Sequence, residues 1–272
     1  IIFEMLSNQA MNAVTENLVL QFYDKALPKV QLPDGVIVSS LNKASVQHPE
    51  LLERCYGRLA RSGKDAINAL NTMLAQDGLL VYVPRGVVVD RTIQVVNILR
   101  ADVDLMVNRR VLVVLEDGAQ ARILVCDHAL DDRNFLATQV SEIFVGENAH
   151  LELYELEETH VKCRRMSNMY VQMQANSTAV LDSITLQNGL TRNRADVRLD
   201  GPGAEVYMNG CVIADQKQHV DNNTLIDHAA AHCQSHQLYK YVLDDEAVGA
   251  FAGRILVREG AQHTVSKETN AN

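Results

Sequence analysis

The feature that most constrains this 272-residue chain is a loose repeat that runs through its last two thirds. Each unit has a turn, a small residue and then alternating apolar positions. The units lie at 118–123, 148–153, 177–180, 203–206 and 260–263, and the first four small residues, at 119, 149, 178 and 204, are 30, 29 and 26 residues apart. A period of this size, carried by strands without helices, is typical of a coiled β-solenoid. In such a fold, stacked coils about 4.8 Å apart bury a continuous aliphatic column.

The strands that carry the repeat begin after Gly78. Short runs rich in Val and Ile lie at 79–83, 87–89, 93–98, 103–107 and 111–115, and turn residues separate several of them. From here on we expect no helix. A β-sandwich is the alternative, but sandwiches favour hairpins about 8–12 residues apart. The Asn-Gly pairs at 188–189 and 209–210 instead lie about one coil apart, so the pattern favours the solenoid.

The first quarter of the chain predicts helices. Pro49 followed by Glu50 is typical of a helix start. Apolar residues then recur at helical spacing at 67, 70, 73 and 74, before a glycine stop signal at 77–78. We read Pro28 and the stretch 33–35 as linker or turn. The predicted organisation is a largely helical N-terminal segment with a linker at 1–78, followed by a β-solenoid core at 79–272.

Composition disfavours several classes of partner. The formal charge is −9, from 34 acidic and 25 basic residues, and a surface of that sign repels phosphate backbones. We therefore expect no nucleic-acid partner. No apolar run approaches the roughly 20 residues of a membrane-spanning helix, and no signal peptide is visible, so we expect no membrane partner. Five widely spaced cysteines without a C-x-x-C pair fit a reduced, cytoplasmic chain. Because the chain has no starting Met and stops without a cap at 269–272, we read it as a fragment.

The motifs of common enzymes are missing from the sequence. It contains no Walker-type phosphate loop, no G-x-G-x-x-G and no G-x-S-x-G. Adjacent carboxylates occur at 131–132, 157–158 and 244–245. Neighbouring acids point to opposite faces of a strand, and in a turn both are usually solvated, so they do not form an acid–base pair. We therefore predict no catalytic residue, and a β-helix carbohydrate-active enzyme stays an alternative.

One cluster of potential metal ligands lies between Asp227 and His236. On an extended strand His228, His232 and His236 would share one face, and Cys233 would lie on the other. Imidazoles bind borderline metals, but these three would span about 13 Å on a straight strand. A single ion would need a bend or ligands from neighbouring coils. We expect these residues to be structural or solvent-facing, and name them as the candidate ligands should a metal bind.

Several segments resemble the SufB/SufD family of iron–sulfur cluster assembly proteins, and SufD most of all. The run ALNTMLAQDGLLVYVPRG at 69–86 is similar to the start of the family core, where a helix ends in QDG and a strand ends in YVP, a basic residue and G. HCQSHQLYK at 232–240 and VLDD at 242–245 resemble the SufD segment HC-x-S-x-QL-x-K-x-VLDD. FAGRILV at 251–257 and AQHT at 261–264 resemble later family segments. The resemblance runs from about residue 49 to the end.

The resemblance implies a right-handed parallel β-helix and a scaffold that is not itself an enzyme. It implies that the chain acts with a SufB-type paralogue and with a SufC-type ABC ATPase, which would explain the missing phosphate loop. No cofactor would be bound permanently, and iron or an iron–sulfur cluster would visit the complex transiently. A homodimer is a further possible state of the isolated chain. The alternatives are the carbohydrate-active enzyme and a purely structural, homo-oligomeric solenoid.

Two departures from the family limit what carries over. SufB has a cysteine, proposed to hold the nascent cluster, in a T-x-C-D-S stretch, whereas this chain reads TNAN at 269–272, and so resembles SufD more. The late CSHGAT segment and the C-terminal helices that contact the ATPase are not in this sequence. No cluster-ligand role therefore transfers to a residue here. Because the last coil of a solenoid needs a cap or a partner, we expect the stretch from Phe251 onward to lie at an interface.

Overall fold

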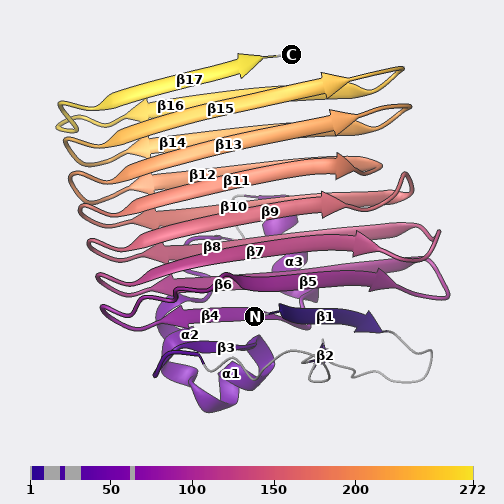
Figure 1. Ribbon diagram of the computed structural model, residues 1–272, viewed down its shortest axis with the longest axis horizontal. Helices are drawn as coiled ribbons and strands as arrows, with labels where there is room; N and C mark the ends of the chain where they lie inside the picture. Colours follow the sequence, from indigo (N-terminus) through magenta and orange to yellow (C-terminus); the bar gives the residue numbers. More distant parts are fainter. Residues whose placement is uncertain (1, 9–18, 22–31, 62–64, 272) are drawn as a thin grey trace.

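Most of the molecule is a β-solenoid of about seven coils, whose strands form two mainly parallel sheets (Figure 1). The computed structural model describes residues 2–8, 19–21, 32–61 and 65–271. The chain passes from one sheet to the other with each successive strand from β4 onward, so sequence neighbours lie in opposite sheets. Every strand pair is parallel except β1–β2 and β3–β4. The predicted mainly β, solenoidal fold is confirmed, while its right-handed sense stays a prediction.

The two sheets differ by one strand. The nine-stranded sheet has the order β17-β15-β13-β11-β9-β7-β5-β1-β2, and the eight-stranded sheet β16-β14-β12-β10-β8-β6-β4-β3. The first sheet contains β1 (Ile2–Asn8), β2 (Val19–Gln21), β5 (Ile93–Arg100), β7 (Gln120–Ala129), β9 (His150–Glu158), β11 (Thr178–Gln187), β13 (Glu205–Ala214), β15 (Gln234–Leu243) and β17 (Val265–Ala271). The second contains β3 (Ile37–Ser40), β4 (Asp77–Val83), β6 (Leu105–Leu115), β8 (Phe135–Val145), β10 (Cys163–Met173), β12 (Leu190–Leu199), β14 (His219–His228) and β16 (Val248–Val257).

The repeat read from the sequence corresponds to the strand register. Gln120 pairs with His150, His150 with Thr178, and Thr178 with Glu205, so successive coils are 30, 28 and 27 residues long. The small residue before each of these strands is fully or almost fully buried; these residues are Ala119, Ala149, Ser177 and Ala204. The third small residue is thus Ser177, one position before the expected one. The runs 103–107 and 111–115 fall largely in the single strand β6, and 87–89 contributes only a bridge through Val88.

A ladder of left-handed residues turns the chain between the sheets at one end of the coils. The ladder has positive φ at Gly118, Asn148, Asn176, Gly203, His232 and His263. Within it, the N–H of one turn donates to a carbonyl of the next coil, for example Gly118 N to Glu147 O at 2.7 Å and His232 N to Gln262 O at 2.9 Å. Gly, Asn and His are residues that adopt this conformation more readily than most. The turns therefore stack in register with the strands.

In the part of the chain that the structure describes, three helices cover the outer face of the eight-stranded sheet near its N-terminal end (Figure 1). They are α1 (Leu41–Gln47), α2 (Pro49–Cys55) and α3 (Ala66–Leu74). The helix start at Pro49 and the turn at 34–35 are confirmed, whereas Pro28 lies outside the described residues. The described part of 1–78 contains β1, β2, β3 and the start of β4 as well as the three helices.

The glycine stop expected at 77–78 is wrong. Helix α3 ends at Leu74, and Asp77 and Gly78 open β4. Gly78 is needed for a different reason: a Cβ there would lie 2.1 Å from the carbonyl oxygen of Arg110 on the neighbouring strand. The buried face of α3 is also polar, formed by Asn68 and Asn71, while Met73 is 72% exposed. Polar contacts, not the apolar stripe, therefore attach this helix.

The interior between the sheets is aliphatic beside the left-handed turns. Two inward-facing rows run from coil to coil in register: Ile93, Ile123, Leu153, Leu181 and Met208 on the nine-stranded sheet, and Val81, Val113, Ile143, Val171, Val197 and Ile226 on the eight-stranded sheet. We call this region the aliphatic half of the interior. It is the stacked column that the sequence predicted.

Candidate functional sites: a buried charge network and an open last coil

Towards the other end of the strands the interior is polar. On the eight-stranded sheet one inward row reads Arg109, Gln139, Ser167, Asn193 and Asn222. On the facing sheet a second row reads Asn97, Asp127, Glu157 and Thr185. All but the half-buried Asn193 are buried. We call this region, with the adjacent Glu155 and Arg165, the polar half of the interior.

Asp127 is the centre of the polar half. Its carboxylate accepts two hydrogen bonds from the Arg109 guanidinium, at 2.7 and 2.9 Å, and one from Arg165 Nε at 2.9 Å. Asn97 Nδ2 donates to it at 2.7 Å. Arg165 Nη1 continues the network to Asn193 Oδ1 at 2.7 Å. The two arginines come from β6 and β10 of one sheet and Asp127 from β7 of the other, so the network joins the sheets through the interior.

Two buried carboxylates in this region have opposite pKa shifts. Burial acts to raise the pKa of Asp127, but the positive charges of Arg109 and Arg165 outweigh burial and hold it well below its usual range. Burial raises the pKa of Glu157 to about 7, although the charge of Arg165 acts to lower it. Thr191 Oγ1 lies 2.7 and 2.9 Å from the two Glu157 oxygens. Of these two carboxyls, Asp127 therefore stays negatively charged, whereas Glu157 titrates near neutrality.

The network closes towards the C-terminal coils. Asn193 Nδ2 donates to Asn222 Oδ1, and Asn222 Nδ2 donates to the Tyr241 hydroxyl, which donates to the carbonyl oxygen of Ala250. The rows then become apolar, at Val212 on one sheet and Phe251 on the other. Towards the C-terminus the polar rows thus end in hydrogen-bonded groups and then in apolar residues.

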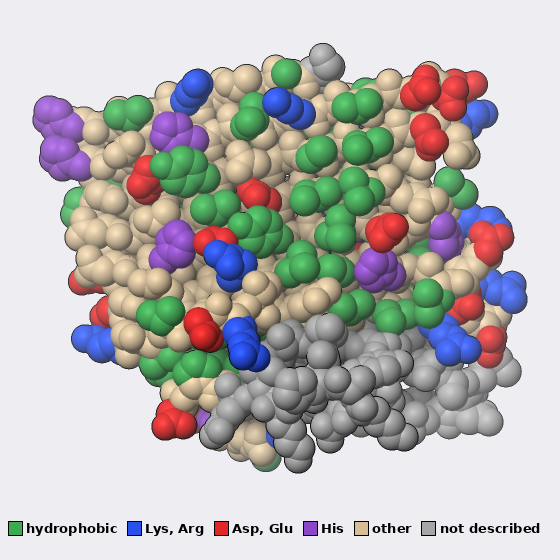
Figure 2. All heavy atoms as spheres, viewed as in Figure 1, with side chains coloured by type: hydrophobic (Ala, Val, Ile, Leu, Met, Phe, Trp, Pro, Cys, Tyr) green, Lys and Arg blue, Asp and Glu red, His purple; other side chains and the backbone are tan. Residues whose placement is uncertain are grey.

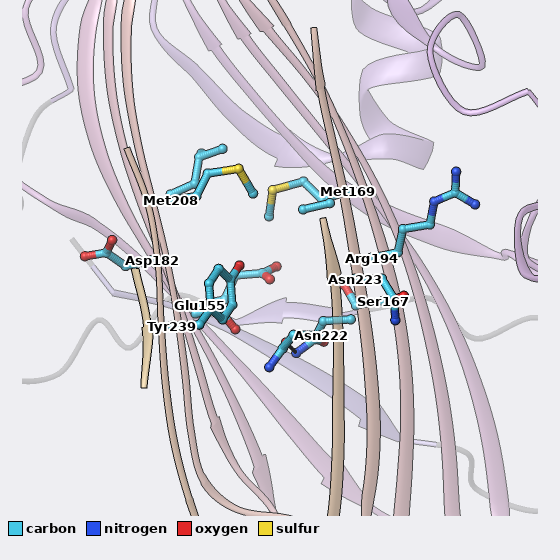
Figure 3. A pocket seen from close by; sticks show the side chains of 13 residues that line it. Glu155, Ser167, Met169, Asp182, Arg194, Met208, Asn222, Asn223 and Tyr239 are labelled. Carbon is cyan, nitrogen blue, oxygen red and sulfur yellow. Dashed lines mark hydrogen bonds between the residues drawn. The ribbon is translucent and has the colours of Figure 1, made fainter. Parts of the chain in front are cut away.

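A small cavity lies where the aliphatic and polar halves meet (Figure 3). Figure 3 shows Met169 and Met208 facing each other from the two sheets, with Glu155 and Tyr239 below Met208 and Asn222 below Met169. The cavity measures about 30 Å³, room for about two water molecules. It is far below the roughly 300 Å³ at which small-molecule pockets begin, so it is not a substrate site.

The prediction that His228, His232 and His236 share one face of an extended strand is wrong, because a turn interrupts the strand. His228 is the last residue of β14, His232 lies in the left-handed turn, and His236 is in β15. His228 is fully buried with Nε2 2.9 Å from Ser235 Oγ, and burial lowers its pKa. The ring of His236 stacks on Tyr207, with centroids 5.0 Å apart.

Cys233 is also placed as a structural residue. It is fully buried, its Sγ lies 3.4 Å from the carbonyl oxygen of Gly201, and burial raises the pKa of its thiol. A thiol with a raised pKa is a poor metal ligand at neutral pH. In the parts of the chain that the structure describes, no group of three or more His, Cys, Asp or Glu side chains is positioned to hold a metal ion. The four candidates are therefore not brought together.

The last coil leaves one edge of each sheet unpaired by any strand among residues 2–8, 19–21, 32–61 and 65–271. Strand β16 pairs with β14 and β17 with β15, each on one side. Val248 N donates to Gln218 O and Arg258 N donates to His228 O, at 2.9 Å each, so these two N–H groups point toward β14. Because N–H groups alternate between the two sides of a parallel strand, the N–H of Ile255 points to the open edge.

Sequence reasoning missed the residues of the polar half. A signal for them existed: Arg109, Asp127 and Glu157 all occupy inward positions by strand alternation, next to apolar positions such as Val107 and Val125. A charged residue at an inward position of a predicted strand is rare unless it has a partner. The partners are far apart in sequence, so their pairing emerges only when the coils stack.

Comparison with known proteins identifies the family. Residues 98–272 match the family described as "SUF system FeS cluster assembly, SufBD core domain", and residues 6–95 match "SufBD protein N-terminal region". No helix among the described residues is both long and apolar enough to cross a membrane.

Individual relatives agree with this match. An iron–sulfur cluster assembly SufBD family protein of Synechocystis is 24% identical over 257 residues, 89% of this chain and 55% of the relative. The Escherichia coli iron–sulfur cluster assembly protein SufD is 25% identical over 158 residues, 58% of this chain and 37% of SufD. The chloroplastic SufBD family protein ABCI8 of Arabidopsis thaliana is 22% identical over 282 residues, 95% of this chain and 48% of its own length. The chain thus spans 37 to 55% of the length of these relatives, and it belongs to the SufBD family of the SUF iron–sulfur cluster assembly system.

Proposed function

We propose that this chain is a SufD-like scaffold subunit, cytoplasmic and without turnover of its own, in a SUF assembly complex. Its partners would be a SufB-type paralogue and a SufC-type ABC ATPase. The observation that carries the proposal is the match of residues 98–272 to the SufBD core domain, in a chain that folds as a parallel β-solenoid. Iron or a nascent cluster is cargo of the complex in this proposal, and the chain holds none permanently.

One argument for a SufD-like rather than a SufB-like role comes from the last strand. In SufB a cysteine would stand where this chain has Ala271, and Ala271 is paired in register with Lys240 on β15. An alanine side chain supplies no thiolate for iron. This position therefore favours the SufD-like role over the SufB-like role within the family.

The edge of β16 is better suited to a partner than that of β17. The inward-facing side chains of β16 include Phe251 and Ile255, which continue apolar surface, whereas β17 presents Glu268 and Asn270 at the equivalent positions. Free backbone donors beside apolar side chains are what an added strand uses for affinity and register. A second β-helix packed against this coil would satisfy both.

The carbohydrate-active enzyme receives no support from the acids of the cleft beside α3. This cleft of about 580 Å³ contains Asp65, Asp196 and Asp227. Asp65 caps α3 and accepts from Asn168 Nδ2, Asp196 is paired with Arg194 at 2.8 Å, and Asp227 is paired with Arg258 at 2.9 Å. Carboxylates held in ion pairs are not poised as a general acid and base.

Co-expression with tagged SufB-type and SufC-type proteins tests the proposal. The variant Ile255→Pro removes the N–H that points to the open edge and leaves the ladder to β14 intact, so we expect the pull-down yield to fall several-fold. Ile255→Val, which keeps the N–H and an apolar, β-branched side chain, serves as the matched control. A melting curve by circular dichroism checks that both variants fold. Undiminished capture of a folded Ile255→Pro chain would refute the pairing through β16.

A further inference from the structure

Two histidines from successive coils stand side by side on the surface. His232 and His263 occupy the same position of the left-handed turn ladder, with φ of 60° and 59°. Their rings are parallel within 6° and their centroids are 5.0 Å apart. Both residues are exposed. In Figure 2, histidine side chains gather at the corner of the molecule where β15 and β17 begin in Figure 1.

The backbone fixes the distance between these rings. His232 N donates to Gln262 O, and Val265 N donates to Cys233 O, so hydrogen bonds join the two turns on both sides of the histidines. The ring separation is close to the coil spacing of about 4.8 Å. The pair is therefore preorganised: neither turn has to move to present both imidazoles to one ligand.

We propose that His232 and His263 form a binding site for one divalent first-row transition-metal cation, with water completing the coordination. Imidazole nitrogen suits Zn²⁺, Ni²⁺, Cu²⁺ and Fe²⁺, whereas Mg²⁺ prefers oxygen. One ion can bind both rings only if the two donor nitrogens come within about 4.2 Å, twice a metal–nitrogen distance of ~2.1 Å. From rings 5.0 Å apart this needs a small tilt of each side chain, and both are free to tilt into solvent.

The turn itself does not require imidazoles. Other coils have Gly118, Asn148, Asn176 and Gly203 at the same position, and their backbone hydrogen bonds are equivalent. Histidine at two successive positions thus adds donor atoms without changing the fold. The site is separate from the buried His228 and from His236, whose ring is stacked on Tyr207.

Calorimetric titration of the full chain with Ni²⁺ tests the site. His232→Asn and His263→Asn keep a residue that the ladder already uses at 148 and 176, so the turns should be retained. Because the second imidazole binds an ion already held by the first, we expect each variant to weaken Ni²⁺ binding roughly tenfold or more. The double variant should be little worse than either single variant.

Two controls separate this site from other donors. His236→Asn should leave Ni²⁺ affinity unchanged, and Mg²⁺ should give no binding that depends on His232 or His263. A melting curve with and without Ni²⁺ gives a second measurement, since a ligand that binds the folded state raises the melting temperature. Ni²⁺ binding that survives in both single variants, or that is lost equally in His236→Asn, would overturn the proposal and leave the rings as a stack alone.

Discussion

The interior of this solenoid is aliphatic beside the left-handed turns and charged towards the opposite ends of the strands. In the aliphatic half each row places Val, Ile, Leu or Met in register. Replacing one of these side chains by the one at the same position of the next coil should therefore cost little stability. In the polar half the charged side chains have specific partners, such as Asp127 with Arg109 and Arg165. Both halves are buried to a similar degree, so burial alone does not separate them.

The difference shows how one solenoid obtains both cohesion and register. Aliphatic rows supply favourable burial but tolerate slippage, because neighbouring coils present nearly identical surfaces. Ion pairs that cross between the sheets do not tolerate such slippage, because a shifted strand would leave a buried charge without its partner. We infer that the polar half selects the correct stacking of β6 to β10, while the aliphatic half supplies most of the stabilisation.

The largest expected effect comes from breaking the polar half. Arg165→Met leaves Asp127 with one guanidinium instead of two and removes a charge from beside Glu155. A buried carboxylate that loses a partner destabilises a protein by about 3 to 5 kcal/mol. Urea unfolding followed by circular dichroism measures the loss.

The matched control is an arginine on the surface of the same fold. Arg122 forms an ion pair with Glu152 but its side chain is 50% exposed, so Arg122→Met should cost far less stability than Arg165→Met. Equal losses in the two variants would mean that the buried network has no special role, and the comparison between the halves would fail.

The second effect is a dependence of stability on pH that belongs to the polar half. The pKa of Glu157 is about 7 in the folded chain and 4.5 as an ordinary glutamate. Because the folded pKa is raised, the stability gained from protonated Glu157 is complete below about pH 4.5 and is lost as pH rises through 7. The loss amounts to roughly 3 kcal/mol.

Glu157→Gln should remove this dependence. Its free energy of unfolding should lack that fall between pH 4.5 and 7.5, and near pH 7.5 it should match or exceed that of the unmutated chain. Leu153→Ala, in the aliphatic half, should lower stability by about 3 kcal/mol but keep the pH profile of the unmutated chain. Parallel pH profiles for Glu157→Gln and the unmutated chain would rule out titration of Glu157 in this range.

The aliphatic half could be predicted well from the sequence, because each of its coils carries the same short apolar pattern. Alternating apolar residues after a small residue predict both the strand and its inward face, and the spacing between units predicts the stacking. The errors fell where a residue is chosen for a contact distant in sequence. Gly78 looked like a helix stop but is required by the carbonyl of Arg110, and α3 attaches through Asn71, which hydrogen-bonds to Arg109 O and to Thr138.

The candidate sites were less predictable for the same reason. His228, His232 and His236 share parity only if the strand continues, and the turn that separates them is set by the ladder of the whole stack. His263 lies 31 residues after His232, and only the coil length brings the two rings together. Such juxtapositions depend on an exact register that a period varying from 26 to 30 residues does not specify.

The smallest expected effect concerns the turns that border the aliphatic half. Asn148 has φ of 55° and donates its N–H to Ala175 O at 2.9 Å, while the equivalent residue one coil earlier is Gly118. Asn148→Ala places a Cβ in a conformation that alanine disfavours and should cost about 1 kcal/mol, whereas Asn148→Gly should be nearly neutral. Unlike the effect of Glu157, this difference should be the same at pH 5 and pH 7.5, as urea unfolding at both values would show. If the alanine variant instead lost stability only at one pH, the two halves of the interior would be coupled through the turns, and the polar half could not be treated as a separate determinant of register.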